Sequence, residues 1–486
     1  MDVMSRRTML RAVGAMGAAA LGRPWRLSAG APPPVSPLMT TLSTYMSGAR
    51  ARSLPADVVE KTKHHIVDTF AAMVSGTELP PGTVALRFAG AHRDQIATIA
   101  GSRALCGAID AAFVNAMLAH ADETDDSHAP SQSHPGCAVV PAALAAGEQF
   151  GISGEALVRA VALGYDVGTR VTMTVGVPGF ETATHVSTHA LASLFGAAAA
   201  AASAAGLGAQ QMRWVLDYAV QQASGTKLWQ RDTDHIEKAF VFAGVGARGG
   251  VTAAELVRLG ATGVDDVLSG ENNLVATFAP NANPQTLVDG LGERYEIART
   301  NIKRWSVGSP IQAPLDALEL IFKRRPFDPD AVKEVVVRCA TSEAALVDNR
   351  EMPDICMQHM VAVMLIDRTA SFRAAHDKPR MQDPAVLRQR AKVRLVGDEE
   401  LQKHLPRREA IVELTLADGT RLTERVDAVR GTAENPMTRE DVVAKCQDLM
   451  APVLGAQQAA ALVKQALDLE HAADVRALRP LLQRAS

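Results

Sequence analysis

One stretch of this chain, residues 195–207, consists almost entirely of alanine and glycine, and it is the feature that most constrains the fold. A helix with so few side chains can pack against its neighbours at short distance. The rest of the chain follows the same trend, because apolar residues reach 47% while aromatic residues are only 4%. Abundant alanine makes up the difference and favours close-packed helices. From Leu38 to about Val275 the sequence pattern predicts helices almost throughout.

The composition changes near residue 285, where short runs typical of β-strands begin. The runs that we predict as strands are 295–300, 331–337, 392–395 and 412–416. The last run alternates, meets Asp418-Gly419 and returns through Leu422, which is a strong hairpin signal. Helical stretches at 314–323 and 358–368 lie among these runs. We therefore predict a small α+β domain over residues 285–430.

The chain returns to a helical pattern after this segment. Thr438 is a candidate N-cap, with Glu440 and Asp441 in the first turn that follows. Two or three short helices make a poor independent core, so we expect the C-terminal residues to pack back onto the first helices. The predicted fold class is mainly α. A large all-helical domain spans 35–284 and is completed by 431–486, with the smaller α+β domain of 285–430 inserted into it.

Charge and cysteine content exclude several functions. The formal net charge of −3 gives no basic footprint for nucleic acid. The five cysteines are odd in number and widely spaced, without a CxxC pair, so neither a disulfide framework nor a zinc knuckle is indicated. We expect mostly buried thiols.

The first 31 residues differ from the rest. Ser5-Arg6-Arg7 precedes a soft apolar run over 12–21, and the small residues Ala29-Gly30-Ala31 follow. This pattern resembles a twin-arginine export signal with a cleavage site, and predicts a periplasmic protein. A disordered basic tail is the alternative. The apolar run is short for a membrane span, so no membrane association is expected after the signal is removed.

Three histidines and four acids gather in the stretch 120–136, between two apolar helical runs. His120 continues a helical spacing that begins at Leu105 and runs through Ile109, Phe113 and Met117, which predicts one helix and a buried, supporting histidine at its end. The same stretch contains enough nitrogen and oxygen ligands for a metal ion, with His120 and Glu123 at i and i+3. Consecutive acids at a helix end are more often capping or solvated groups, so we predict no metal.

Two strings of this sequence resemble signatures of the MmgE/PrpD family. The first runs from Asn115 to His128 and continues into His134-Pro135-Gly136, and the second is Gly431-Thr-Ala-Glu-Asn-Pro-Met-Thr438. The likeness covers nearly all of the chain after residue 31. It implies cofactor-independent enzymes that act on small polycarboxylates, such as 2-methylcitrate dehydratase, cis-aconitate decarboxylase and an epimerase of iminodisuccinate. It also implies a helical domain, an α+β lid and a homodimer.

The resemblance places the family's acid-cluster positions on Glu123, Ser127 and His134. Many relatives have aspartate and threonine at the first two positions. Glutamate and serine here keep the same functional groups, a carboxylate and a hydroxyl, but change how far the side chains reach. Glu123 and Ser127 are four residues apart, so they would share one face if the helix ran on. Helix-end capping is the alternative role for these two residues.

The remaining family positions fall later in the chain. A histidine before the Gly/Ala helix corresponds to His185 or His189, with a slight preference for His185. Two family lysines correspond to Lys238 and Lys303, which without the resemblance would be read as solvated surface lysines. His359 stands near the position where relatives often have tyrosine, and we expect it to contact the substrate. This departure bears on the identity of the substrate.

These residue types suit one kind of chemistry. Removing a proton next to a carboxylate needs a base, and expelling a hydroxyl group or protonating carbon needs an acid, both of which histidine can supply. The two lysines would bind carboxylates and stabilise enolate-like charge by about 2–4 kcal/mol each. We expect His134 to be the leading acid/base group, His185 or His189 its partner, and Glu123 and Ser127 to orient them.

The sequence therefore predicts a cofactor-independent lyase, a dehydratase or alternatively a decarboxylase, for a small hydroxy-di- or tricarboxylate. The expected partners are this substrate and a second copy of the chain, without nucleic acid. An isomerase or epimerase needs the same bases and stays open, as does a non-catalytic periplasmic carboxylate-binding protein. Clustered titratable groups favour catalysis over simple binding.

Overall fold

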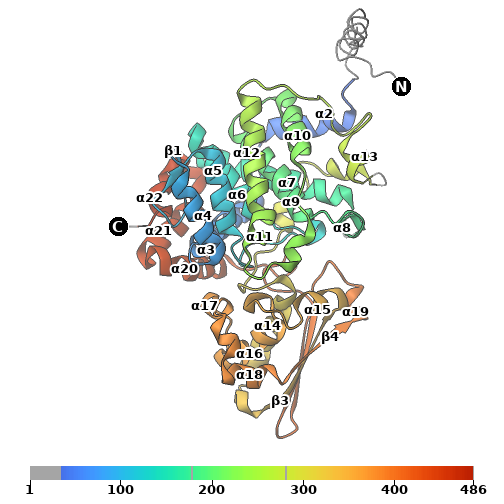
Figure 1. Ribbon diagram of the computed structural model, residues 1–486, viewed down its shortest axis with the longest axis vertical. Helices are drawn as coiled ribbons and strands as arrows, with labels where there is room; N and C mark the ends of the chain where they lie inside the picture. Colours follow the sequence, from blue (N-terminus) through green and yellow to red (C-terminus); the bar gives the residue numbers. More distant parts are fainter. Residues whose placement is uncertain (1–33, 177–178, 280–281, 485–486) are drawn as a thin grey trace, which may run out of the picture. The chain divides into compact units, whose positions relative to one another are not determined.

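The computed structural model describes residues 34–176, 179–279 and 282–484, so the predicted export signal lies outside the described residues. Helices dominate this part of the chain, which confirms the mainly α fold class (Figure 1). The long helices of the first half are α2 Pro37–Gly48, α3 Ala56–Gly76, α4 Pro80–Ala91, α5 Ala108–Ala119, α6 Gly136–Phe150, α7 Gly154–Val175, α9 Thr188–Ala204, α10 Ala209–Gln222 and α12 Val245–Arg258. The shorter helices α8 Gly179–Thr184, α11 Ile236–Ala239 and α13 Leu274–Phe278 lie between them or follow them.

The Ala/Gly segment forms most of α9, and it packs as closely as its composition predicts. Helices α7 and α12 both lie against α9. A Cβ atom added at Gly164 of α7 would lie 2.8 Å from the carbonyl oxygen of Gly196, and one added at Gly196 would lie 2.8 Å from that of Gly164. Backbones this close leave no room for larger residues, so small side chains fix the distance between the helices.

One long helical run passes through α11, a π-helical turn at Phe240–Gly244 (η4) and α12. Its residues, Ile236–Arg258, are apolar and numerous enough to cross a membrane by length and composition, but 67% of the apolar window is buried inside the protein. A core helix of a soluble protein passes the same test, so this run is weak evidence for a membrane span. Its burial against α9 and α5 accounts for its composition.

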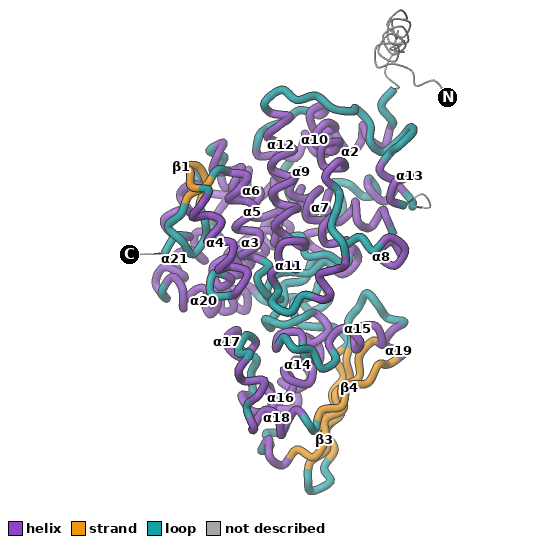
Figure 2. The backbone as a smooth tube through the Cα atoms, viewed as in Figure 1, coloured by secondary structure: helices purple, strands orange, loops and turns teal. Residues whose placement is uncertain are grey.

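A four-stranded sheet lies in the second half of the chain (Figure 2). Its strands are β3 Val332–Ala340, β4 Val393–Asp398, β5 Ala410–Leu416 and β6 Arg421–Val426, in the order β4-β3-β5-β6. Strands β3 and β4 are parallel and the other pairs are antiparallel. The predicted hairpin is confirmed, with Gly419 of its turn at a φ of 84°. Helices α14 Ser309–Arg324 and α16 Met357–Asp367 pack against the sheet.

Two predictions of local structure are wrong. Residues 295–300 are not a strand, because Glu296–Arg299 forms a 3₁₀ turn whose Glu296 carboxylate is held by Arg294, Arg299 and His128. Ionic contacts therefore bury this segment in place of strand pairing. The helix predicted to include Leu105 begins only at Ala108, because Leu105 and Cys106 pair with β1 Arg93–Thr98 as a short strand, β2.

The C-terminal helices are α20 Arg439–Leu454, α21 Ala456–Leu467 and α22 Arg479–Leu482. Thr438 caps α20 as predicted, since its hydroxyl accepts from the backbone N–H of Asp441 at 3.1 Å. Helices α20 and α21 pack against α3, where Lys445 Nζ lies 2.6 Å from a carboxylate oxygen of Asp68. The division into a helical body with an α+β lid stays a prediction. All five cysteines are buried and unpaired, as expected.

Candidate active site

The acidic stretch forms a buried loop between two helices. Helix α5 ends at Ala119 with His120 as its C-cap residue, and α6 begins at Gly136. Every residue from His120 to His128 is nevertheless buried. Since the helix does not run on, Glu123 and Ser127 do not share a helical face, and neither acts as a helix cap. Ser127 instead exchanges backbone hydrogen bonds with Asn301 at 2.8 and 3.0 Å.

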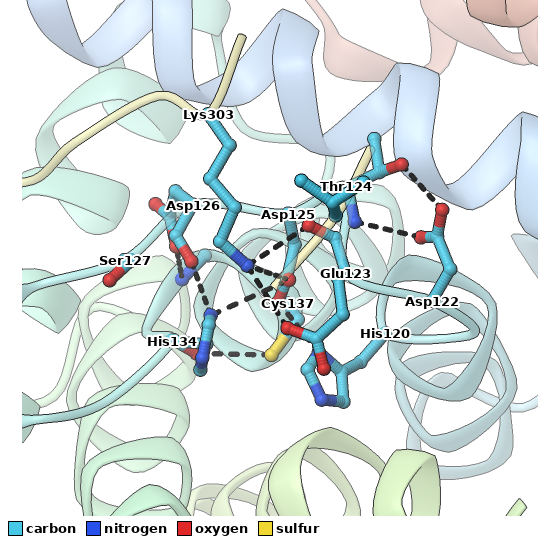
Figure 3. A network of polar contacts seen from close by, with 12 residues as sticks. His120, Asp122, Glu123, Thr124, Asp125, Asp126, Ser127, His134, Cys137 and Lys303 are labelled. Atoms are coloured by element: carbon cyan, nitrogen blue, oxygen red, sulfur yellow. Dashed lines mark hydrogen bonds and ion pairs between the residues drawn. The ribbon is translucent and has the colours of Figure 1, made fainter. Parts of the chain in front are cut away.

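Glu123 binds two lysines that come from distant parts of the chain. Figure 3 shows one of them, Lys303, with its ammonium group directed at Glu123 and Asp125. Glu123 Oε1 is paired with the ammonium group of Lys238, and Glu123 Oε2 lies 3.4 Å from Lys303 Nζ. Lys303 also donates to the carbonyl oxygen of Glu123 at 3.0 Å. Both lysines are buried, so they are not the solvated residues that their type alone would suggest. Burial would raise the pKa of Glu123, but Lys238 and Lys303 hold it well below its ordinary range.

Several histidine rings surround the lysine pair, gathered around one aromatic side chain. The ring of Phe242, in the π-helical turn, stacks on His189 at 3.7 Å between centroids and on His120 at 4.7 Å. His134 stacks on His189 at 5.0 Å, and His235 lies 5.2 Å from His120. Such π-turns occur frequently at functional sites. Here the turn brings Phe242 against three of the rings.

These imidazoles are neutral near pH 7. Burial lowers the pKa of His134 well below its ordinary value, and the nearby Lys303 lowers it further. Burial likewise lowers the pKa of His120 and of His189 to about 3, and that of His235 well below the ordinary range. A neutral imidazole offers one donor and one acceptor nitrogen, so each ring can accept a proton.

The position of the proton on His134 follows from its contacts. His134 Nδ1 lies 2.5 Å from the carbonyl oxygen of Asp126, and since a carbonyl only accepts, Nδ1 carries the hydrogen. In the neutral ring Nε2 is then the free base. The side chain of Asp126 is held in turn by the hydroxyl of Tyr165, by the backbone N–H of Gly136 at 3.0 Å and by His65 at 2.9 Å. This buried network fixes the orientation of His134.

Asp125, in the same cluster, has a raised pKa. Burial raises its pKa well above the ordinary value, and although Lys303 opposes this, the neighbouring carboxylates of Asp126 and Glu123 add to the rise. Its Oδ2 lies 2.8 Å from His120 Nδ1 and its Oδ1 lies 3.5 Å from His134 Nδ1. The cluster therefore places a carboxyl group with a raised pKa beside imidazoles with lowered pKa values, an arrangement that supports proton transfer.

The metal alternative rests on three of these residues. Ligand atoms of His120, Asp125 and His134 all lie within 4.8 Å of one another. Lys303 Nζ, however, lies 3.6 Å from Asp125 Oδ1, and the pKa of Lys303 is raised because Glu123 and Asp125 outweigh the effect of burial. A divalent cation here would stand next to an ammonium group, which like-charge repulsion disfavours. The arrangement fits proton transfer better than metal binding.

Two of the predicted site residues lie away from the cluster. The side chain of His185 is exposed on a turn with a φ of 59°, whereas His189, four residues later, stacks on His134. The geometry therefore favours His189 and removes the preference for His185. His359 is buried in α16, and the charged groups that influence its pKa are Arg390, Arg380 and Asp377. All three belong to the α+β segment, and none belongs to the cluster.

Sequence reasoning overlooked several members of the cluster. His235 is three residues before Lys238, so its place in the sequence was a usable signal. The sequence pattern indicates capping or solvated roles for the consecutive acids, Asp125 among them, whereas in the structure Asp125 contacts His120 directly. Phe242, and Trp229 whose ring centroid lies 4.7 Å from that of Phe242, gave no signal, because an aromatic residue in an apolar run looks like ordinary core.

A cavity of about 360 Å³ adjoins the cluster, and Ser127 and Lys303 are among its lining residues. Lys303 therefore contacts the cavity and Glu123 together. A ligand in the cavity would reach an ammonium group that is already part of the acid/base cluster. Cavities of this size are typical for small-molecule ligands.

Comparison with known proteins identifies the family. The MmgE/PrpD N-terminal domain matches residues 40–287, and the MmgE/PrpD C-terminal domain matches residues 305–469. A cis-aconitate decarboxylase of Homo sapiens is 25% identical, with 91% of this chain and 94% of the human protein covered. A cis-aconitate decarboxylase of Aspergillus terreus is 24% identical, with 90% and 94% covered. The chain thus belongs to the MmgE/PrpD family.

Proposed function

We propose that this protein is a lyase that acts on a small polycarboxylate of the aconitate type by acid/base catalysis. The observation that carries the proposal is the buried cluster in which Glu123 binds Lys238 and Lys303 beside neutral histidines. Paired buried cations suit substrate carboxylates, and neutral imidazoles next to a carboxyl group with a raised pKa suit proton transfer.

In the proposed reaction His134 Nε2 accepts or returns the proton at the reacting carbon, because its Nδ1 hydrogen is committed to Asp126. His189 is the second imidazole at the same face. Lys238 and Lys303 bind substrate carboxylates and stabilise the negative charge that develops on the substrate, and the low exposure of the site strengthens that stabilisation. Asp125 supplies a proton through its contact with His120.

Decarboxylation is the first reaction to test, because the similar proteins of human and Aspergillus terreus are named cis-aconitate decarboxylases. Dehydration of a hydroxy acid needs the same base and the same cations, together with an acid for the departing hydroxyl group. It is the alternative within the same proposal. The two reactions differ in the group that leaves the substrate, not in the side chains that surround the substrate.

The decisive experiment is proton NMR in deuterated water with purified protein and a panel of carboxylic acids: cis-aconitate, citrate, 2-methylcitrate, malate, tartrate and aminodicarboxylates. Loss of carbon dioxide marks a decarboxylase and a new double bond marks a dehydratase. Deuterium exchange with inversion and no loss of either group would replace the proposal by an epimerase. Saturable binding without any change in the acid would replace it by a binding protein.

A matched pair of variants assigns the activity to the cluster. Lys303→Ala removes a buried cation of the cluster, while Lys403→Ala removes an exposed lysine whose side chain is 66% accessible. We expect the first to lower kcat/KM at least 100-fold and the second to leave it unchanged. Equal activity of the two variants would contradict the assignment of the activity to the cluster.

Two further parts of the proposal concern the whole protein. We propose a homodimer, which light scattering on the purified chain will test. We also propose export by the twin-arginine route, for which residues 1–35 fused to a reporter give the test. A reporter that stays in the cytoplasm, or that moves equally well when Arg6 and Arg7 are both lysine, contradicts export.

A further inference from the structure

The cavity beside the cluster has a cationic wall that the proposed chemistry does not yet use. Among its lining residues the side chain of Glu434 is the single carboxylate, whereas five are cations: Arg299, Lys303, Arg407, Arg408 and Arg430. They come from three separate segments of the chain, around 299–303, 404–408 and 428–434. Like charges gathered from three segments repel one another, so a ligand that brings negative charge would be stabilised there.

Each arginine of this wall is held at one side by a glutamate that does not line the cavity: Arg299 by Glu296, Arg407 by Glu409, Arg408 by Glu343 and Arg430 by Glu319. Arg408 Nε lies 2.5 Å from Glu343, and its Nη1 lies 3.5 Å from the hydroxyl of Ser127. Arg430 Nη2 lies 3.1 Å from Glu319. A guanidinium group has five N–H donors, so each arginine keeps donors that its carboxylate does not use. A guanidinium group that is fixed by one carboxylate and keeps unused N–H donors can bind a second carboxylate in the bidentate manner.

The cavity and the acid/base cluster share Lys303. Its ammonium group lies 3.4 Å from Glu123 Oε2, and the residue also lines the cavity. Ser127 stands between the two as well, because it lines the cavity and its hydroxyl faces Arg408. One ligand can therefore contact Lys303 and the arginines together.

We propose that this cavity is a carboxylate subsite, in which Arg408 and Arg430 bind a carboxylate of the substrate remote from the reacting carbon. The proposal rests on the proposed function and narrows it to tricarboxylates. Lys238 and Lys303 bind the carboxylates at the reacting end, and the arginine wall binds the third. Acids that lack this remote carboxylate leave the remaining N–H donors of the arginines unused and bind more weakly.

The test uses two probes that differ by one carboxylate and carry no double bond or hydroxyl group. Propane-1,2,3-tricarboxylate and propane-1,2-dicarboxylate (methylsuccinate), which lacks one terminal carboxylate, are titrated calorimetrically into the full chain at constant ionic strength. We expect the tricarboxylate to bind about tenfold tighter, the lower end of the range for hydrogen bonds to a charged group, because the arginines are already paired with glutamates. Arg408→Gln and Arg430→Gln are each expected to abolish most of this preference while methylsuccinate affinity changes less than about twofold.

Arg394→Gln is the matched control, since Arg394 is an exposed arginine paired with Glu334 at 3.4 Å and does not line the cavity. It should keep the wild-type preference. Arg408→Lys retains the charge without the planar fork, and is expected to restore only part of the preference if Arg408→Gln folds poorly. An unchanged ratio of the two affinities in both Arg408→Gln and Arg430→Gln, or no preference in the wild type, overturns the proposal.

This test is independent of turnover. A clear tricarboxylate preference in a protein that converts none of the panel acids would defeat the proposed lyase and leave the subsite standing. Turnover of cis-aconitate with the same KM in wild type and Arg430→Gln would support the proposed lyase and defeat the subsite.

Discussion

Replacing Glu123 by glutamine tests whether the centre of the cluster is an ion pair that burial makes essential. The glutamine keeps the shape of the side chain but removes the single negative charge shared by Lys238 and Lys303. Breaking a buried ion pair leaves an uncompensated charge and typically costs about 3–5 kcal/mol. We expect the free energy of unfolding at pH 7 to fall by about 3 kcal/mol, since one of the lysines can lose its proton and limit the cost.

The effect should depend on pH in a defined direction. The pKa of Glu123 in the folded protein lies well below its ordinary value of 4.5, so its contribution to stability is complete above pH 4.5 and is lost as pH falls through the folded pKa. Urea denaturation followed by circular dichroism between pH 3 and pH 8 measures the difference between variant and wild type. That difference should be largest at neutral pH and should shrink in acid.

Glu400→Gln provides the control, because Glu400 forms an exposed pair with Lys403 at 2.7 Å and should contribute less than about 1 kcal/mol. Adding Lys238→Met to Glu123→Gln removes one of the two uncompensated charges and should recover part of the stability. If Glu123→Gln costs no more than Glu400→Gln at pH 7, the cluster is not a buried ionic centre and the reasoning from burial fails.

Three other predictions address the base, a contact beside the cluster and the helix packing. His134→Gln should lower kcat about 10²–10⁴-fold in the NMR assay with little change in stability, and activity within a few-fold of wild type would exclude His134 as the base. Burial would lower the pKa of His376, but Asp122 at 3.0 Å raises it to about 9. The stability that protonated His376 contributes is therefore complete below pH 6.5 and is lost as the pH rises through 9. His376→Gln should therefore cost about 2–3 kcal/mol at pH 6 and nothing near pH 10, and a pH-independent cost would contradict this. Gly196→Ala should destabilise by about 1–3 kcal/mol in urea, whereas Gly90→Ala, with no atom within 4 Å of the new Cβ, should not; equal effects would disprove the close packing.

The parts of the fold that the sequence predicted correctly are those encoded locally. The Ala/Gly run became the closely packed helix α9, and alternation around Asp418-Gly419 became the hairpin of β5 and β6. Residues 295–300 have a strand-like composition, yet their conformation depends on where Glu296 finds its cationic partners. Those partners include His128, which lies far away in the sequence. Local propensity cannot supply that information.

The candidate site shows the same limit. The sequence located the acidic stretch, but the positions of its side chains depend on α5 ending at Ala119. The choice between His185 and His189 depends on a turn that directs one ring to solvent and leaves the other against Phe242. The resemblance that identified Lys238 and Lys303 carried no information on the arginines of the cavity, which gather only in the folded chain.

The charge distribution of the folded site explains why a polyanion would bind there. Lys303 joins the buried cluster to a cavity whose lining includes four arginines and a single carboxylate, that of Glu434. Positive charge gathered in this way attracts a ligand with several carboxylates. Each carboxylate that arrives also favours the protonated form of the neighbouring imidazoles, whose pKa values burial and the lysines now depress. Substrate binding would therefore bring the pKa of His134 closer to neutrality, where an imidazole can both accept and return a proton during one turnover.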